Sequence, residues 1–100
     1  MRRGTTPTFV FTLPFDTKNL SKARVIFEHS DDVKLIKVVE KDNFDGNKIT
    51  ITLTQEETLL FYCNSYIKVQ LRVLTANNEV LASDVNKVFV CECLDDEVME

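Results

Sequence analysis

The chain of 100 residues is long enough for one domain with a single hydrophobic core. Its 44% apolar and 28% charged residues are ordinary for a globular protein, and two glycines and two prolines exclude collagen-like or low-complexity structure. A net charge of −4 argues against a general attraction to nucleic acid or to an anionic membrane, so neither is expected as a partner.

The beginning of the sequence carries no recognisable export signal. Arg2 and Arg3 are followed by small and polar residues at 4–6, where a secretory signal would continue with an apolar run. No stretch approaches the roughly 20 apolar residues that cross a bilayer. We therefore expect the protein to be made and to fold in a reducing cytoplasm.

Residue types that bind metals are few in this sequence. The three cysteines, Cys63, Cys91 and Cys93, form no CxxC pair, and we interpret them as small buried apolar residues. The only histidine, His29, precedes Ser-Asp-Asp at 30–32, and we interpret it as a solvated turn residue. Since a zinc site needs three or four ligands, no metal and no cofactor are expected.

The first half of the chain has the pattern of short strands. Residues 1–7 are predicted to form an extended arm, followed by a strand at 8–13 that ends before Pro14. Alternating apolar residues predict two further strands at 22–28 and 33–40, joined by a polar hairpin loop.

A capping box marks the middle of the chain. An Asp-Gly pair at 45–46 predicts a turn into a strand at 48–53. Directly after this strand, Thr54 and Glu57 have the spacing of a capping box, in which each side chain bonds the backbone N–H of the other residue. This spacing predicts one short helical turn near 55–60.

The longest strand signal covers residues 66–75, where the apolar residues at 67, 69, 71 and 73 alternate with Tyr66, Lys68, Gln70 and Arg72. Asparagines at 77–78 predict a tight turn, since asparagine tolerates positive φ. The segments 80–83 and 85–93 are then expected to return as one or two strands.

These elements predict an all-β protein, an immunoglobulin-like antiparallel β-sandwich of six or seven strands at 8–94, with a solvated acidic tail at 95–100. A partly closed barrel is the second choice. The predicted core comprises apolar residues from one face of the main strands: Phe9, Phe11, Val25, Phe27, Ile49, Ile51, Ile67, Val69, Leu71 and Val73.

The sequence lacks the residue patterns of an enzyme. His29 belongs to no Ser-His-Asp arrangement, and two glycines cannot form a phosphate-binding loop. The paired acids at 31–32, 56–57 and 95–96 have structural interpretations in a turn, a helix cap and a tail. We therefore predict that the protein is not an enzyme.

Three stretches resemble small structural proteins of bacteriophages and prophages of Gram-positive bacteria: MRRGTTPTFVFTLPFD, LTQEETLLF and VQLRVLTANNEVLASD. The succession of ITITLTQEET, a polar step, a strand ending in QLRVLT and a hairpin is also similar to the N-terminal domain of phage baseplate upper proteins. The resemblance implies a tail or baseplate component that acts through protein–protein contacts. It also implies a location in the bacterial cytoplasm during assembly and then in the virion.

A ligand-binding sandwich of the carbohydrate-binding type is the alternative function. Such domains usually present a row of flat aromatic side chains that most often includes tryptophan, and this chain has none.

The outward face of the predicted strand 66–75 is the candidate interface, with Tyr66, Lys68, Gln70, Arg72 and Leu74. Tyrosine and arginine are enriched at interface hot spots, and an apolar residue beside them is more than solvation requires. The expected partner is another phage structural protein or a second copy of the chain, which would give a homo-oligomer. The alternative interpretation is an ordinary wet sheet face.

Overall fold

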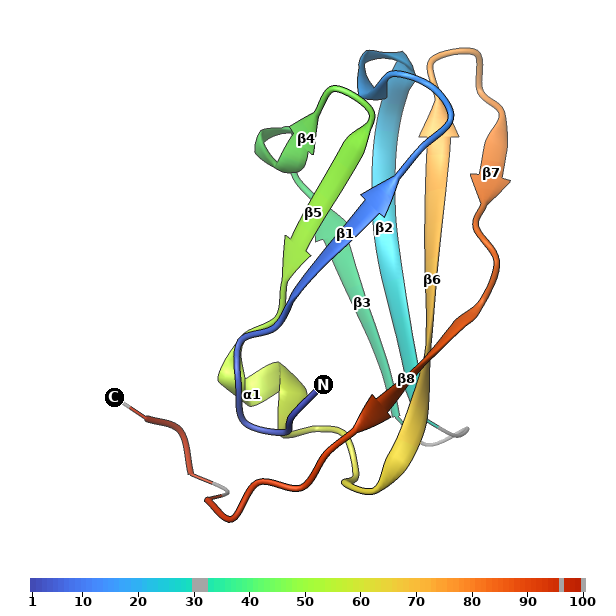
Figure 1. The fold of residues 1–100 in the computed structure, drawn as a ribbon. Coiled ribbons are helices and arrows are strands. Elements are labelled where there is room, and N and C mark those ends of the chain that lie inside the picture. The colour runs from blue at the N-terminus through green and yellow to red at the C-terminus, as the bar shows by residue number, and fades with distance from the viewer. Residues whose placement is uncertain (30–32, 96, 100) are drawn as a thin grey trace.

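The structure, a computed structural model, describes residues 1–29, 33–95 and 97–99 (Figure 1). The strands are β1 Thr8–Thr12, β2 Leu20–His29, β3 Val33–Val39, β4 Phe44–Asp45, β5 Lys48–Thr52, β6 Ser65–Thr75, β7 Val80–Ala82 and β8 Asn86–Val90. The described part also contains one α-helix, α1 Gln55–Thr58, and two short 3-10 helices, Thr17–Asn19 and Lys41–Asn43.

The strands form two antiparallel sheets (Figure 1). The small sheet has the order β1-β5-β4 and the large sheet the order β3-β2-β6. β6 pairs on its other edge with β7 toward its end and with β8 toward its start. Because the two sheets share one apolar core, the all-β sandwich predicted from the sequence is confirmed.

The details of the strand arrangement go beyond the prediction. The described part has eight strands instead of six or seven. The returning segment divides into β7 and β8, as the sequence allowed, and the additional strand is β4, which has only two residues and was not predicted. β2 lies between β3 and β6, whereas the second strand of an immunoglobulin domain shares a sheet with the first and fifth strands.

The core lies between the two sheets. Phe9 and Phe11 are partly buried and pack against it. The Phe27 ring lies 5.4 Å from the Phe9 ring and 6.4 Å from the Phe61 ring, so that it joins both sheets and the connection after α1. The other predicted core residues are buried, as expected: Val25, Phe27, Ile49, Ile51, Ile67, Val69, Leu71 and Val73.

The capping box predicted from the sequence is present at the start of α1. The Thr54 hydroxyl accepts from the Glu57 N–H at 3.2 Å, and the Glu57 carboxylate accepts from the Thr54 N–H at 2.8 Å. The same carboxylate accepts from the Lys37 ammonium at 2.8 Å. The helix cap is thereby linked to β3, the edge strand of the large sheet.

Glu57 gives a pH-dependent prediction. Burial of its carboxyl raises its pKa, but hydrogen bonds from Lys37 and Thr54 and the charge of Lys37 lower it by more, so that the pKa lies below 4.5. A carboxyl whose pKa is lower in the folded chain than in the unfolded chain stabilises the fold at any pH above its pKa in the unfolded chain. This stabilisation is lost as the pH falls through its pKa in the folded chain.

We therefore expect Glu57→Gln to lower the free energy of unfolding by about 1 kcal/mol at pH 7. The difference from the wild type should begin to shrink as the pH falls below about 4.5, where the carboxyl of the unfolded chain takes up a proton, and should disappear below the lowered pKa of the folded state, where the native carboxyl is protonated too. Urea denaturation of both proteins from pH 3 to pH 7 measures this. A difference that stays constant over that range would contradict the account.

The interpretation of His29 as a solvated turn residue was wrong. β2 continues through position 29, so the alternation that buries Val25 and Phe27 also buries His29, which is only 8% exposed. Its Nε2 lies 2.7 Å from the Ser65 Oγ, and its ring meets the Tyr62 ring edge-on at 4.8 Å. The other residues of the predicted hairpin loop, 30–32, lie outside the described residues.

The cysteines are less buried than predicted. Cys63 is exposed, because it lies in the loop between α1 and β6, just before Asn64, which has a positive φ of 57°. Cys91 and Cys93 follow the end of β8 and are half-buried.

Residues 1–7 lie against the domain and are bonded to α1 and to the segment after β8. The Arg3 guanidinium donates to the carbonyls of Leu59 and Phe61 at 2.9 and 2.7 Å. The Gly4 N–H donates to the Thr58 hydroxyl at 3.0 Å. Gly4 has a φ of +79°, a conformation that side chains with a Cβ rarely adopt, so glycine suits this close approach.

Candidate interaction surface

The five predicted interface residues lie together on the solvent side of β6. They alternate with the buried residues Ile67, Val69, Leu71 and Val73, so they point away from the core. Their neighbours in space are the outward residues of β2, β3, β7 and β8. We call this side of the large sheet the outer face.

Apolar residues on β2 and β3 extend the outer face. Gln70 pairs with Ile26, which in turn pairs with Ile36 on β3. In the adjacent row, Val38 pairs with Arg24 and is 67% exposed. These apolar neighbours could not be placed from the sequence, because the prediction considered β6 without its strand partners.

The start of β6 carries an aromatic pair. Tyr66 pairs with Phe89 of β8, and the two ring centroids lie 5.1 Å apart at an interplanar angle of 71°. Tyr66 is 62% exposed and Phe89 40%. The faces of the two rings are therefore not coplanar, whereas a sugar stacks on a flat row of aromatic rings.

The outer face concentrates positive charge on a chain whose net charge is −4. Glu28 is the only acidic residue in the five strands of the large sheet, and it lies 3.7 Å from Lys34. The outer face carries six of the twelve lysines and arginines of the chain: Lys22, Arg24, Lys34, Lys68, Arg72 and Lys87. The net charge of the whole chain therefore does not describe this surface.

A groove of about 550 Å³ crosses one end of the outer face. Its charged lining residues are Lys22, Arg24, Lys41, Arg72 and Glu40, four cations and one carboxylate. We call it the basic groove.

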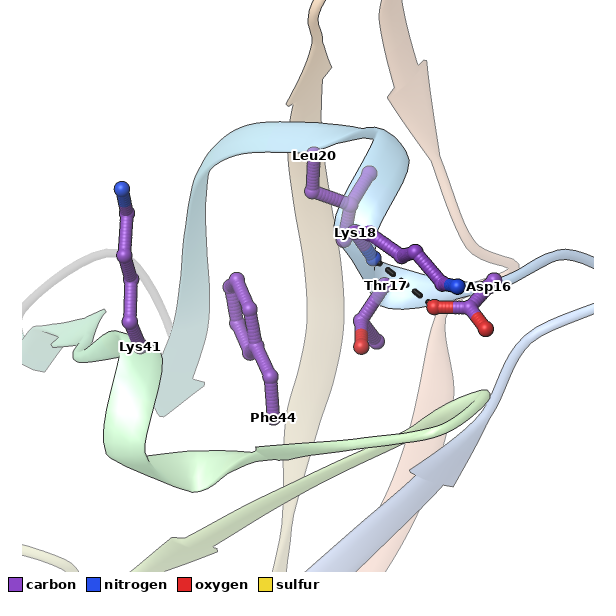
Figure 2. A pocket seen from close by; sticks show the side chains of 6 residues that line it. All are labelled: Asp16, Thr17, Lys18, Leu20, Lys41 and Phe44. Carbon is purple, nitrogen blue, oxygen red and sulfur yellow. Dashed lines mark hydrogen bonds between the residues drawn. The ribbon is translucent and has the colours of Figure 1, made fainter.

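A second hollow, of about 260 Å³, lies where the two 3-10 helices approach each other (Figure 2). Figure 2 shows the Phe44 ring between Lys41 on one side and Thr17 and Lys18 on the other. The Asp16 carboxylate accepts from the Lys18 N–H at 2.9 Å, and the Thr17 hydroxyl donates to the Gly46 carbonyl at 2.7 Å. These polar groups hold the local fold and do not converge on the hollow as a reactive set.

The His29–Ser65 pair combines a base with a hydroxyl, and the sequence analysis missed it. The Ser65 hydroxyl donates to the Tyr62 carbonyl at 2.8 Å, so its proton does not point to the imidazole. A serine nucleophile needs its proton directed to the base. This arrangement therefore ties β2 to the start of β6 and does not activate Ser65.

Within residues 1–29, 33–95 and 97–99, no three side chains of His, Cys, Asp or Glu are grouped as metal ligands would be. None of the helices in this part of the chain has the length and hydropathy of a membrane span. Comparison with protein-family models and with curated proteins gave no match.

Proposed function

We propose that this protein is a structural module of a bacteriophage or prophage particle, a tail or baseplate component that works through protein–protein contacts and not through catalysis. Its partners would be other phage structural proteins or further copies of itself. It would be present in the bacterial cytoplasm during assembly and then in the virion. The resemblance of three stretches of the sequence to phage structural proteins supports the phage assignment.

The outer face is the main structural support for a role in protein–protein contacts. One side of the large sheet packs on the core, while the other exposes Ile36, Val38, Tyr66, Val80 and Phe89. Contiguous exposed apolar side chains on a single protein mark interaction sites. Here Val38 pairs with Arg24, which pairs in turn with Arg72, while Tyr66 and Phe89 form a separate pair at the start of β6. Arginine and tyrosine are the residue types that most often dominate binding energy.

A double variant, Tyr66→Ala with Arg72→Ala, tests this function. Both side chains lie outside the buried core, so we expect the thermal midpoint of the free chain to stay nearly unchanged. Incorporation into particles, measured by mass spectrometry of the purified phage, should be lost, because truncated hot-spot residues cost several kcal/mol of binding energy.

The matched control is Val10→Ala with Lys48→Ala, which removes one apolar and one charged side chain from exposed positions on the small sheet. This control should enter particles like the wild type. Normal incorporation of the Tyr66 and Arg72 variant would place the contact elsewhere and overturn the proposal.

Carbohydrate binding remains the alternative, and the tilted Tyr66–Phe89 pair does not favour it. A ligand that binds only the folded state raises its stability. Thermal stabilisation of the chain by host cell-wall glycans would support this alternative.

A further inference from the structure

We propose that the basic groove binds the acidic segment 94–100 of a second copy of the chain, so that copies associate head to tail. This inference rests on the proposed role of the outer face as a protein-contact surface, and it names the partner of one part of that face.

The register of the large sheet places like charges opposite each other in the groove. Arg24 on β2 pairs directly with Arg72 on β6. Like charges in directly opposite positions destabilise a sheet. No carboxylate of the described residues forms an ion pair with either arginine. A carboxylate from another molecule would relieve this repulsion, and arginine binds carboxylates in a bidentate geometry.

The groove also has apolar contacts to offer. Val38 and Val80 stand at its two sides, and Leu74, which pairs with Val80, lies between them. A suitable ligand is therefore an extended segment with both carboxylates and aliphatic side chains.

The chain itself contains such a segment in Leu-Asp-Asp-Glu-Val-Met-Glu at 94–100. Four of its residues are acidic and three are apolar, and Leu94 is 97% exposed. Seven extended residues reach about 23 Å, whereas four strands at about 4.8 Å spacing span about 14 Å. The segment is therefore long enough to cross the groove.

The end of β6, where the groove lies, and the chain that follows β8 are at opposite ends of the molecule (Figure 1). The groove is at Arg72 and Leu74, near the end of β6, while the segment leaves β8 beside the start of β6. Met99 is bonded to Gln55 at the helix end of the sandwich, and the segment would exchange these two hydrogen bonds for contacts with the groove of another copy. A copy therefore presents its segment to another molecule, and such a contact between unlike surfaces builds rings or open chains of copies.

Charge reversal on the full chain tests this contact. The groove variant is Arg24→Glu, and the segment variant combines Asp95→Lys with Glu97→Lys. Sedimentation velocity at low salt should show concentration-dependent association of the wild type, at least about tenfold weaker for either variant, because like charges across an interface oppose binding. Salt at 1 M should weaken the wild-type association, since it reduces the Debye length to about 3 Å.

A mixture of the two variants distinguishes a specific contact from general charge effects. In the mixture, the carboxylate that Arg24→Glu introduces in one variant's groove would face the ammonium groups that Asp95→Lys and Glu97→Lys introduce in the other variant's segment. The unchanged segment of the first variant would also match the unchanged groove of the second. The mixture should therefore associate more tightly than either variant does alone. Lys48→Glu, on the small sheet, makes the same kind of charge change outside the groove and should associate like the wild type.

A fluorescent peptide with the sequence of residues 94–100 gives a second readout. Fluorescence anisotropy should show binding to the wild type and binding at least about tenfold weaker to Arg24→Glu. Circular dichroism spectra confirm that each variant is folded. A monomeric wild type that leaves the peptide unbound would overturn the inference, as would equal association of all variants or binding of duplex DNA in place of the peptide.

The failures of the two proposals are distinguishable. If copies do not associate, but particle incorporation still depends on Tyr66 and Arg72, the structural role stands and the head-to-tail contact is wrong.

Discussion

Phe27→Ala is expected to lower the free energy of unfolding by about 3–5 kcal/mol, a large part of the stability of a domain of this size. The Phe27 side chain is fully buried. Its ring contacts Phe9 of the small sheet at 5.4 Å and Phe61 after α1 at 6.4 Å. Alanine would remove the ring that joins the layers and leave a cavity that close packing does not refill.

Phe89→Ala is the matched control, because it removes the same ring from a partly exposed position on the outer face. Its cost should stay below about 1 kcal/mol. Urea denaturation followed by circular dichroism measures both variants. Equal losses would show that Phe27 does not hold the two layers together.

Thr58→Val is expected to lower the free energy of unfolding by about 1–3 kcal/mol, because it removes hydrogen bonds from buried groups. Thr58 is fully buried at the end of α1. Its hydroxyl lies 3.0 Å from the carbonyls of Thr5 and Gln55 and accepts from the Gly4 N–H at 3.0 Å. Valine has nearly the same shape, so the change removes the hydrogen bonds of the hydroxyl to Gly4, Thr5 and Gln55 without removing the packing of the side chain.

Thr12→Val provides the control for this variant, since Thr12 is exposed on β1. Its denaturation midpoint should match that of the wild type. If Thr58→Val also unfolds at the wild-type midpoint, the hydroxyl does not hold the N-terminal residues to the domain.

The strands and most of the core could be predicted because each main strand buries one face, and this produces period-two alternation in the sequence. Thr54 and Glu57 similarly predicted the helix, because their contacts join residues only three positions apart in the chain. The docking of residues 1–7 could not be predicted. It depends on Arg3 and Gly4 meeting Thr58 and Phe61, which are distant in sequence and carry no periodic signal.

His29 shows the limit of local signals most directly. A histidine beside Ser-Asp-Asp has the composition of a turn, but the pairing of β2 with β3 extends to position 29 and buries its ring. Tertiary pairing overrides local composition in such positions.

Only part of the candidate interface could be predicted from the sequence. Alternation along one strand placed Tyr66 and Arg72 on the solvent side. The register with β2, β3 and β8 adds Arg24, Val38 and Phe89 to the same surface, and this register arises from pairing between distant segments. That register also forms the basic groove, which could not be predicted from the composition and net charge of the chain.

Hydroxyl-radical footprinting of the chain, free in solution and within purified phage particles, tests the interface role most directly. We predict that Tyr66, Leu74 and Phe89 are oxidised in the free chain and protected in particles. Tyr62, which is exposed in the loop before β6, should be oxidised in both. Particles that lack the chain, or an outer face that is oxidised equally in both states, would contradict the account.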